Sequence, residues 1–315
     1  MNQDNKQNFE EAFKIQKAFT EKLFKEKYDK NIANFTRDER LRWSKEYILS
    51  SAKEIFEMLD ELNWKTHRYI NKEDSMDNFA EEGIDAFKFL LNLFIINGFD
   101  ADYFYTKFLE KSIVVDIRYE QEKQLKEAKS SSRVYVAFDI DGILNDYPLN
   151  FIRYFNYLGF DYKSIDEFKS IDIVSYTAVK KKFRMAGEER NCKPNMPGIE
   201  LLKKAQDSGY GIILLTARPF NKITRLFFDT IQWLKDNEIH YDFLFFAEEK
   251  EEYLINNFNK ESIKCVIDDQ IDNANKLCKF FETYLVFNNA LYEEDDLRYA
   301  NKIINVVKDI NQIQL

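Results

Sequence analysis

The first part of the chain carries its apolar residues at helical spacing. From residue 9 onward they recur every three or four positions, which places them on one face of a helix. The recurring residues are Phe9, Phe13, Ile15, Phe19, Leu23 and Phe24, then Ile48, Leu49, Ala52, Ile55, Phe56, Leu59 and Leu62. Thr36 before Asp38 and Glu39 is typical of a helix start, and Gly98 of a helix end. Residues 1–128 are therefore predicted to form an all-α bundle of four or five helices.

The pattern changes after residue 128. Residues 129–133 are polar and serine-rich, and we interpret them as a linker between two domains. Short apolar runs then alternate with helical stretches, which predicts an α/β domain with a parallel sheet over residues 134–315. The predicted strands are 134–138, 211–215, 243–246, 264–267 and 284–287. Residues 147–197 form an insert rich in aromatic residues and lysines.

Side chains that can take part in catalysis or bind a metal follow the ends of four predicted strands. They are Asp139 and Asp141, Thr216, Lys250, and the pair Asp268 and Asp269. The carboxyl ends of parallel strands lie at one edge of a sheet, so we expect these groups to converge there. Residues two apart in a strand point the same way, which lets Asp139 and Asp141 aim at one point. Gly142 then allows a close turn of the backbone.

Two pairs of carboxylates stand out in the helical part, Glu54 with Glu57 and Glu82 with Asp85. Each pair is spaced i, i+3, which places both members on one helix face. Two neighbouring helices could therefore direct four carboxylates at one volume. Such oxygen ligands suit Mg²⁺ bound to substrate phosphates. The alternative is a solvated helix face, which is common in a chain with 32% charged residues.

Composition narrows the classes of partner. The 315-residue chain has a formal net charge of −9 and a pI near 5.1, which argues against nonspecific binding to nucleic acid or to an anionic membrane. Its three cysteines and two histidines are widely spaced and fit neither a disulfide framework nor a zinc site. The polar residues 1–8 lack the order of a signal peptide. We expect a cytoplasmic protein without a membrane span.

The strand-end residues resemble the four motifs of the haloacid dehalogenase (HAD) superfamily of phosphatases. The motifs occur in order: Asp139-x-Asp141, Thr216, Lys250 and Asp268-Asp269. The resemblance implies a Rossmann-like domain in which Asp139 attacks phosphorus and Asp141 serves as general acid and base. Thr216 and Lys250 would bind the transferring oxygens.

The same resemblance implies a metal ion and a cap. Mg²⁺ would be held by Asp139, the backbone carbonyl of Asp141, and Asp268 or Asp269. The insert 147–197 would be a small helical cap that closes over the substrate. Asn145-Asp146, together with Ala217-Arg218-Pro219 after the threonine, looks like the deoxyribonucleotidase branch, with Arg218 as a substrate contact.

The acidic pairs are similar to the signature of the all-α nucleoside triphosphate pyrophosphohydrolases, in the dimeric dUTPase branch related to MazG. The likeness includes residues 62–65 and 84–91 and spans most of 9–120. It implies that Mg²⁺ is bound by Glu54, Glu57, Glu82 and Asp85, and that the domain forms a homodimer. Lys111 and Arg118 would contact phosphates, Gln16 the nucleobase, and Trp64 would stack near it. Thr20 and Val115 depart from the family pattern at positions that bear on base and sugar recognition.

These resemblances predict a two-step nucleotide hydrolase. The helical domain would convert a deoxynucleoside triphosphate, such as dUTP or dCTP, to monophosphate and pyrophosphate. The HAD domain would then release the nucleoside and phosphate. Two alternatives remain open: a helical domain that only dimerises the chain or senses a nucleotide, and a HAD site that acts on the phosphorylated ends of polynucleotides.

Overall fold

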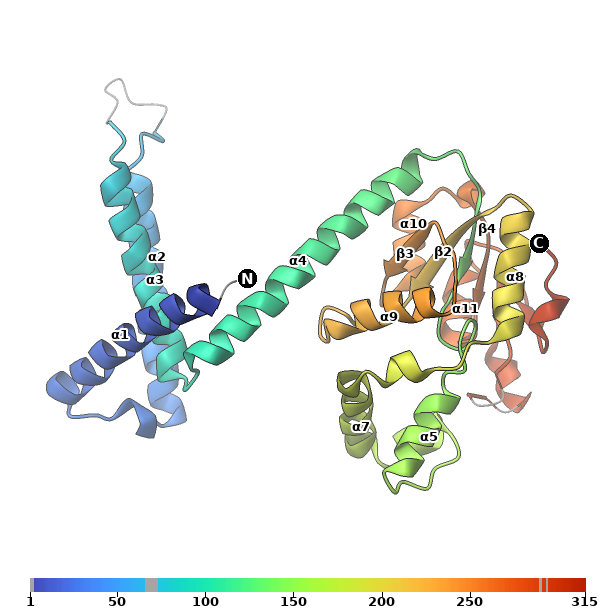
Figure 1. Ribbon diagram of the computed structural model, residues 1–315, viewed down its shortest axis with the longest axis horizontal. Helices are drawn as coiled ribbons and strands as arrows, with labels where there is room; N and C mark the ends of the chain where they lie inside the picture. Colours follow the sequence, from blue (N-terminus) through green and yellow to red (C-terminus); the bar gives the residue numbers. More distant parts are fainter. Residues whose placement is uncertain (1–2, 66–72, 289–290, 293) are drawn as a thin grey trace. The chain divides into compact units, whose positions relative to one another are not determined.

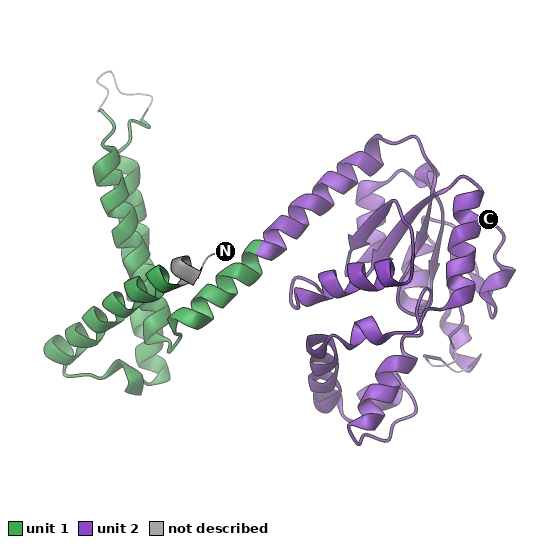
Figure 2. Ribbon diagram, viewed as in Figure 1, with its two compact units in different colours: residues 1–112 green, residues 113–315 purple. Residues whose placement is uncertain are grey.

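The computed structural model describes residues 3–65, 73–288, 291–292 and 294–315 (Figure 1). The chain forms two compact units, residues 1–112 and 113–315 (Figure 2). The division falls inside helix α4 (Ala101–Ser130), which belongs in part to each unit. The predicted linker, residues 129–133, covers the last two residues of α4 and the start of the loop before the first strand. No helix among the described residues is long and apolar enough to span a membrane.

The first unit is helical, as its apolar spacing predicts. Its elements are α1 (Gln3–Tyr28), the 3-10 helix η1 (Ile32–Asn34), α2 (Arg37–Asp60), α3 (Met76–Ile96) and the start of α4. Thr36 caps α2 by accepting from the Glu39 backbone, while the Glu39 side chain accepts from the Thr36 backbone. Phe24 is fully buried, and its ring centroid lies 4.8 Å from that of Trp43, with the two ring planes at 90°. The all-α prediction for this part is confirmed.

The second unit contains a parallel sheet. Within the described residues its strand order is β3-β2-β1-β4-β5-β6. The strands are β1 (Tyr135–Phe138), β2 (Gly211–Thr216), β3 (Phe243–Phe246), β4 (Ile263–Asp268), β5 (Thr283–Val286) and β6 (Asn305–Val307). The helices between them are α8 (Met196–Asp207), α9 (Arg225–Asp236), α10 (Lys250–Asn257), the 3-10 helix η3 (Lys260–Ser262) and α11 (Ile271–Leu277). Two further 3-10 helices, η4 (Glu294–Tyr299) and η5 (Ile310–Gln312), lie near the C-terminus. The α/β prediction is confirmed.

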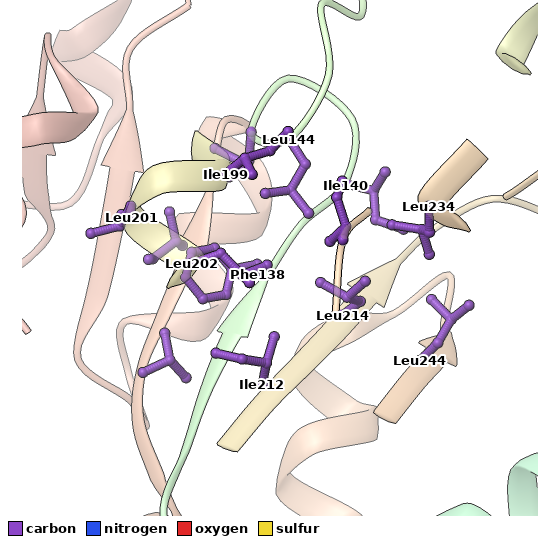
Figure 3. Close-up of a cluster of buried hydrophobic side chains, with 14 of the residues drawn as sticks. Phe138, Ile140, Leu144, Ile199, Leu201, Leu202, Ile212, Leu214, Leu234 and Leu244 are labelled. Carbon is purple, nitrogen blue, oxygen red and sulfur yellow. The ribbon is translucent and has the colours of Figure 1, made fainter. Parts of the chain in front are cut away.

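Both faces of the sheet are covered by helices. Alternate strand residues point to opposite faces, so Phe138 and Leu214 share one face and Ala137 and Ile213 the other. On the first face the apolar residues of α8 and α9 pack against the strands, as Figure 3 shows for Leu202 and Leu234. Residues of α10, α11 and the end of α4 cover the second face. This two-sided burial explains why β1, β2 and β3 read as continuous apolar runs.

The insert after β1 folds as a helical cap with its own core. It contains α5 (Leu149–Tyr157), α6 (Ile165–Ile171), α7 (Ile173–Ala186) and the 3-10 helix η2 (Glu188–Asn191). Most aromatic residues of the insert pack against one another in this core, including Phe151, Phe155, Phe168, Tyr176 and Phe183. They hold the cap helices together.

The strand pattern missed only one element that the structure describes. The edge strand β6 is three residues long, and Asn305 and Val306 are exposed, so it gives no continuous apolar run. Its position is set by pairing with β5, where Leu285 lies opposite Val306. An edge strand of this length is specified by its neighbour more than by its own sequence.

Candidate functional site

Three neighbouring strands bring the predicted HAD residues to one edge of the sheet. In the order β2-β1-β4, Thr216 ends β2, Asp139 follows β1 and Asp268 ends β4. The pairing continues past β1, because the backbone N–H of Asp139 donates to the carbonyl of Ile267 at 2.9 Å. Lys250 reaches the same edge from the start of α10, the helix that follows β3. The carboxyl edge of a parallel sheet is where such folds bind their ligands.

A buried ion-pair group joins two of these strand ends. The Lys250 Nζ lies 2.8 Å from an oxygen of Asp139 and 2.7 Å from an oxygen of Asp268. All three side chains are at most 5% exposed. Asp268 is also held by the backbone N–H of Gln270 at 2.9 Å and by Asn273 at 3.3 Å. Lys250 therefore lies between Asp139, the candidate nucleophile, and the carboxylate of Asp268, and it forms an ion pair with each.

Asp269 completes a cluster with the geometry of a cation site. Oxygens of Asp139, Asp268 and Asp269 lie within 4.8 Å of one another, and all three residues are buried. Asn288, just beyond β5, donates to one Asp269 oxygen at 3.3 Å, and the other has no hydrogen-bond partner among the described residues. A buried carboxylate oxygen without a donor requires compensation. Asp268 is already engaged by Lys250 and Gln270, so Asp269 has the carboxylate oxygen that remains open to a cation.

The electrostatics of the cluster favour the binding of a cation. Burial raises the pKa of Asp139 to about 7, with Asp268 and Asp141 adding to the shift and Lys250 opposing it. Burial also raises the pKa of Asp269 well above its ordinary value, together with the charges of Asp139 and Asp268. One ammonium cannot balance three buried carboxylates. Three oxygen donors at one point suit Mg²⁺, which prefers carboxylate ligands and retains water molecules in its shell.

Gly142 makes the close approach of Asp269 possible. Its backbone has a φ of +80°, which favours glycine, and a Cβ at this position would lie 1.7 Å from an Asp269 oxygen. The glycine therefore belongs to the site because no side chain fits between the turn after β1 and the carboxylate. The turn itself is held by Asn145, whose side-chain oxygen accepts from the backbone N–H groups of Gly142 and Tyr147 at 3.2 and 3.0 Å.

Asp141 is held by a buried arginine. Arg218 donates from Nη2 and Nε to the two Asp141 oxygens at 2.5 and 3.1 Å, and Asn145 adds a third donor at 2.9 Å. Burial alone would raise the pKa of Asp141, but Arg218 outweighs it and lowers the pKa to about 2. In this arrangement Asp141 is a carboxylate, the form that accepts a proton.

Arg218 links the loop after β1 to the cap and to α9. Its guanidinium is 1% exposed, lies 3.2 Å from Glu189 in η2, and donates to Thr230 in α9 at 2.8 Å. The Arg218 backbone N–H donates to the Thr216 hydroxyl at 3.4 Å. The structure thus places the predicted substrate contact against Asp141 and Glu189, where it orients Asp141.

Sequence reasoning missed several partners of the predicted residues. Asn288 follows a predicted strand and lies at the same edge as the aspartates, so its position was a usable signal. Asn273, one turn into α11 beyond Asp268, could have been inferred in the same way. Glu189 had no such signal, because it belongs to a short 3-10 helix whose position depends on how the cap folds back.

A large cavity of about 1000 Å³ opens beside the site. Gly142, Asn145 and Asn288 form the part of its wall that contacts the aspartates. The remaining wall comes from residues 146–147, α5, Lys163 before α6, residues 193–197 and the end of β5. It includes three basic residues, Arg153, Lys163 and Lys193. A small substrate can reach the strand edge from this side.

The helical unit brings together three of its four predicted metal ligands. Oxygens of Glu54, Glu57 and Glu82 lie within 4.8 Å of one another and are partly exposed. Burial raises the pKa of Glu54, and its hydrogen bonds to Glu57 and Glu82 add to the shift. Lys53 lies 2.5 Å from Glu57, whose pKa it lowers. Asp85 is not part of this group; it is exposed and accepts from Lys88 at 3.1 Å.

The predicted nucleotide contacts of the helical part lie on several elements. Gln16 is buried and donates to Asn92 at 2.9 Å, and Thr20 donates to the same oxygen at 2.6 Å. Trp64 is 47% exposed, with the Lys65 ammonium 5.1 Å from its ring centroid. The exposed residues Lys111, Val115 and Arg118 lie along α4, and the last two belong to the second compact unit. Gln16 and Thr20 therefore form part of an internal polar contact between α1 and α3.

Comparisons with known proteins were made for the whole chain. No protein-family model matches it, and no curated protein matches it. A predicted phosphatase from Clostridium acetobutylicum is 16% identical over 56% of this chain and 94% of that chain, with a TM-score of 0.42. A putative beta-phosphoglucomutase from Thermotoga maritima is 20% identical over 56% and 94% of the two chains, with a TM-score of 0.38. A HAD-superfamily hydrolase from Ehrlichia chaffeensis is 13% identical over 58% and 95%, with a TM-score of 0.33.

Proposed function

We propose that the second unit is a Mg²⁺-dependent phosphomonoesterase that works through an aspartyl-phosphate. The observation that carries this proposal is the buried group at one sheet edge in which Lys250 bridges Asp139 and Asp268, with Asp269 beside them. It combines a nucleophile, a cation held against it and an acidic cluster with room for a metal. A structural ion pair alone would not leave a buried Asp269 oxygen without a donor.

The reaction consists of two displacements at phosphorus. In the first, an oxygen of Asp139 attacks phosphorus, the bond to the leaving oxygen breaks, and Asp141 gives that oxygen a proton. In the second, water attacks the aspartyl-phosphate and loses its proton to Asp141, which releases inorganic phosphate and restores Asp139. Lys250 and Thr216 bind the oxygens of the transferring group. When bound, Mg²⁺ supplies the positive charge that lets a carboxylate approach an anionic phosphate.

The Asp141–Arg218 pair adds a condition to this scheme. As it stands, the pair keeps Asp141 deprotonated, which suits the second step. The first step requires a protonated Asp141, so substrate binding has to weaken the contact with Arg218 before the leaving group departs. Arg218 is thus assigned to positioning Asp141.

The test of this activity is release of inorganic phosphate from phosphate monoesters by the purified full chain. Deoxynucleoside monophosphates such as dUMP and dCMP are the first substrates to supply, with Mg²⁺ and then with excess EDTA. Release with Mg²⁺ that stops with EDTA is the expected result. Absence of release from every monoester tried would reject the proposal.

We further propose that the helical unit prepares this substrate by converting a deoxynucleoside triphosphate to monophosphate and pyrophosphate. The clustered oxygens of Glu54, Glu57 and Glu82 support a Mg²⁺ site there. Asp85 stands apart, so the site is assigned three carboxylates rather than four. The two activities belong together chemically, because the product of the first is a substrate of the second.

Replacement of Glu54 tests this activity separately. Glu54→Gln is expected to lower pyrophosphate release from dUTP or dCTP at least a hundredfold, because it removes a charged metal ligand, and to leave phosphate release from dUMP unchanged. The control is Glu46→Gln, an exposed glutamate on the same helix, which should change neither product. Both products are measured with Mg²⁺ present.

The main alternative is a helical unit that binds or dimerises without hydrolysis. The internal position of Gln16 and Thr20 motivates it, because neither side chain is available to a base. In that case the wild-type chain would release no pyrophosphate from any nucleoside triphosphate, and Glu54→Gln would alter no turnover. Phosphate release from the second unit would continue.

The helical unit is also proposed to form a homodimer. Large apolar side chains on α2 and α3 are strongly exposed, among them Leu49 at 67%, Phe56 at 68% and Ile84 at 59%. Exposed apolar residues of this size on adjacent helices are typical of an interface. Light scattering on the full chain should give about twice the chain mass of 37.8 kDa. A monomer at micromolar concentration would exclude a stable dimer.

A further inference from the structure

A second, smaller cavity of about 370 Å³ lies between the cap and the loop after β2. Its wall comes from α7 on one side and from residues 219–223 on the other. Four of its lining residues are basic: Lys180, Lys181, Arg184 and Lys222. Tyr176 supplies an aromatic surface. The cavity is large enough for a small charged group.

Lys180 is the anchor of this cavity. Its Nζ donates to the hydroxyls of Tyr147 and Tyr176 at 2.8 and 3.1 Å, and it lies over both rings. No carboxylate forms an ion pair with Lys180 in the part of the chain that the structure describes. An ammonium carries three donors, so the two hydroxyls leave one donor without a hydrogen bond to the described residues, and the charges of Glu189 and Asp141 act on Lys180 without forming an ion pair with it. Burial and the nearby Arg184 lower the pKa of Lys180 to about 8.

The remaining charges leave the cavity positive. The Nε of Arg184 lies 3.6 Å from Glu189 and makes no hydrogen bond to any described residue. Glu189 also forms an ion pair with Arg218, so one carboxylate faces the guanidiniums of both Arg184 and Arg218. Lys222 is paired with Glu248 at 3.3 Å, and both side chains are more than half exposed, so this pair is weak. Lys181 is exposed at the cavity wall.

The cavity is connected to the phosphatase site by charge contacts. Asp141 lies 2.5 Å from Arg218, Arg218 lies 3.2 Å from Glu189, and Glu189 lies 3.6 Å from Arg184. Residues 219–223 follow directly on Thr216-Ala217-Arg218, at the same edge of the sheet. Three successive ion pairs therefore link Asp141 to Arg184 in the wall of the cavity.

We propose that this basic cavity binds a second phosphate group of the substrate, so that the enzyme prefers compounds with two phosphates over their monophosphates. The inference rests on the proposed phosphatase activity of the second unit and adds the chemical class of its preferred substrate. The deoxynucleoside monophosphates made by the helical unit would then be its weaker substrates. A guanidinium and several ammoniums around one volume recognise a phosphate dianion better than a neutral base or sugar. The preference applies to the group that stays on the substrate, while Asp139 attacks the other.

Matched substrate pairs test the proposal. Thymidine 5′-monophosphate is compared with thymidine 3′,5′-bisphosphate, and fructose 6-phosphate with fructose 1,6-bisphosphate, by phosphate release from the full chain with Mg²⁺. The bisphosphate of at least one pair should have a kcat/KM about tenfold higher. Lys181→Ala and Lys222→Ala should each reduce that ratio about fivefold, mainly through KM. The control is Lys182→Ala, an exposed lysine on the same helix that does not line the cavity.

Each other outcome has a defined meaning. If no bisphosphate is preferred, or if Lys181→Ala and Lys222→Ala leave the ratio unchanged, the inference is overturned. An equal loss in Lys182→Ala would also overturn it, because the effect would then belong to the net charge of the helix. Absence of phosphate release from every compound would instead reject the proposed phosphatase, and the inference with it.

Discussion

Asp139→Asn is expected to abolish phosphate release, with a loss of about a thousandfold or more in kcat, while the chain stays folded. The amide has nearly the shape of the carboxylate but cannot attack phosphorus, so the covalent step is lost. Lys250 keeps its second partner, Asp268, at 2.7 Å. The measurement is phosphate release from the best monoester with Mg²⁺ under saturating conditions.

The stability of this variant separates a catalytic effect from a folding defect. Burial raises the pKa of Asp139 to about 7, so the folded protein retains a proton that the unfolded chain loses near its ordinary value of 3.8. The folded state is then disfavoured as the pH rises from about 4 to 7, because it must give up that proton in a buried acidic cluster. Asparagine removes this cost. At pH 8 without metal, Asp139→Asn should melt at or above the wild-type temperature.

Two controls complete the experiment. Asp272→Asn changes an exposed aspartate in the first turn of α11 and should leave phosphate release unchanged. Pyrophosphate release by the helical unit should also persist in Asp139→Asn. Phosphate release by Asp139→Asn at more than a tenth of the wild-type rate would show that another group is the nucleophile. A fall in melting temperature would assign Asp139 a structural role.

The strands and the residues at their carboxyl ends could be predicted, because both follow from the pattern of apolar and polar residues along the chain. The strands β1, β2 and β3 are continuous apolar runs because both faces of the sheet are buried, and a polar residue follows each run within two positions. Asp139, Thr216 and Asp268 could be placed at one edge for the same reason, since parallel strands share their carboxyl ends. Period and order along the chain were sufficient for this.

The partners of these residues depend on tertiary contacts that no local pattern contains. Arg218 reads from the sequence as a substrate contact, yet its guanidinium is buried between Asp141 and Glu189, which are separated by 48 positions in the sequence. The choice between Asp268 and Asp269 as metal ligand also needed the structure, because it depends on which carboxylate Lys250 occupies. Such choices follow from side-chain packing.

The helical unit shows the same limit on a smaller scale. The i, i+3 rule correctly put Glu54 and Glu57 on one face of α2, and Glu82 of α3 joins them. Asp85 occupies the equivalent position on α3, but its exposed carboxylate pairs with Lys88 instead. Helix periodicity predicts only which face of a helix a side chain lies on. A shared metal ion requires the ligand oxygens to lie within a few ångströms of one another.

Gly142→Ala is expected to reduce phosphate release about a hundredfold and to raise the Mg²⁺ concentration needed for half-maximal activity. The new Cβ would lie 1.7 Å from an Asp269 oxygen and 2.3 Å from its carboxyl carbon, so either the turn or the carboxylate must shift. A displacement of about 1 Å at a metal ligand is enough for a loss of this size. The alanine also has to adopt a φ of +80°, which costs about 1–3 kcal/mol of stability.

Gly209→Ala separates these two effects. Gly209 has a similar φ of +87°, but a Cβ there meets no described atom within 4 Å. Gly209→Ala therefore loses stability only through the unfavourable backbone conformation. Both variants should lower the melting temperature, and Gly142→Ala alone should change activity and Mg²⁺ dependence. If the two variants behaved alike, the contact between the turn and Asp269 would have no part in catalysis.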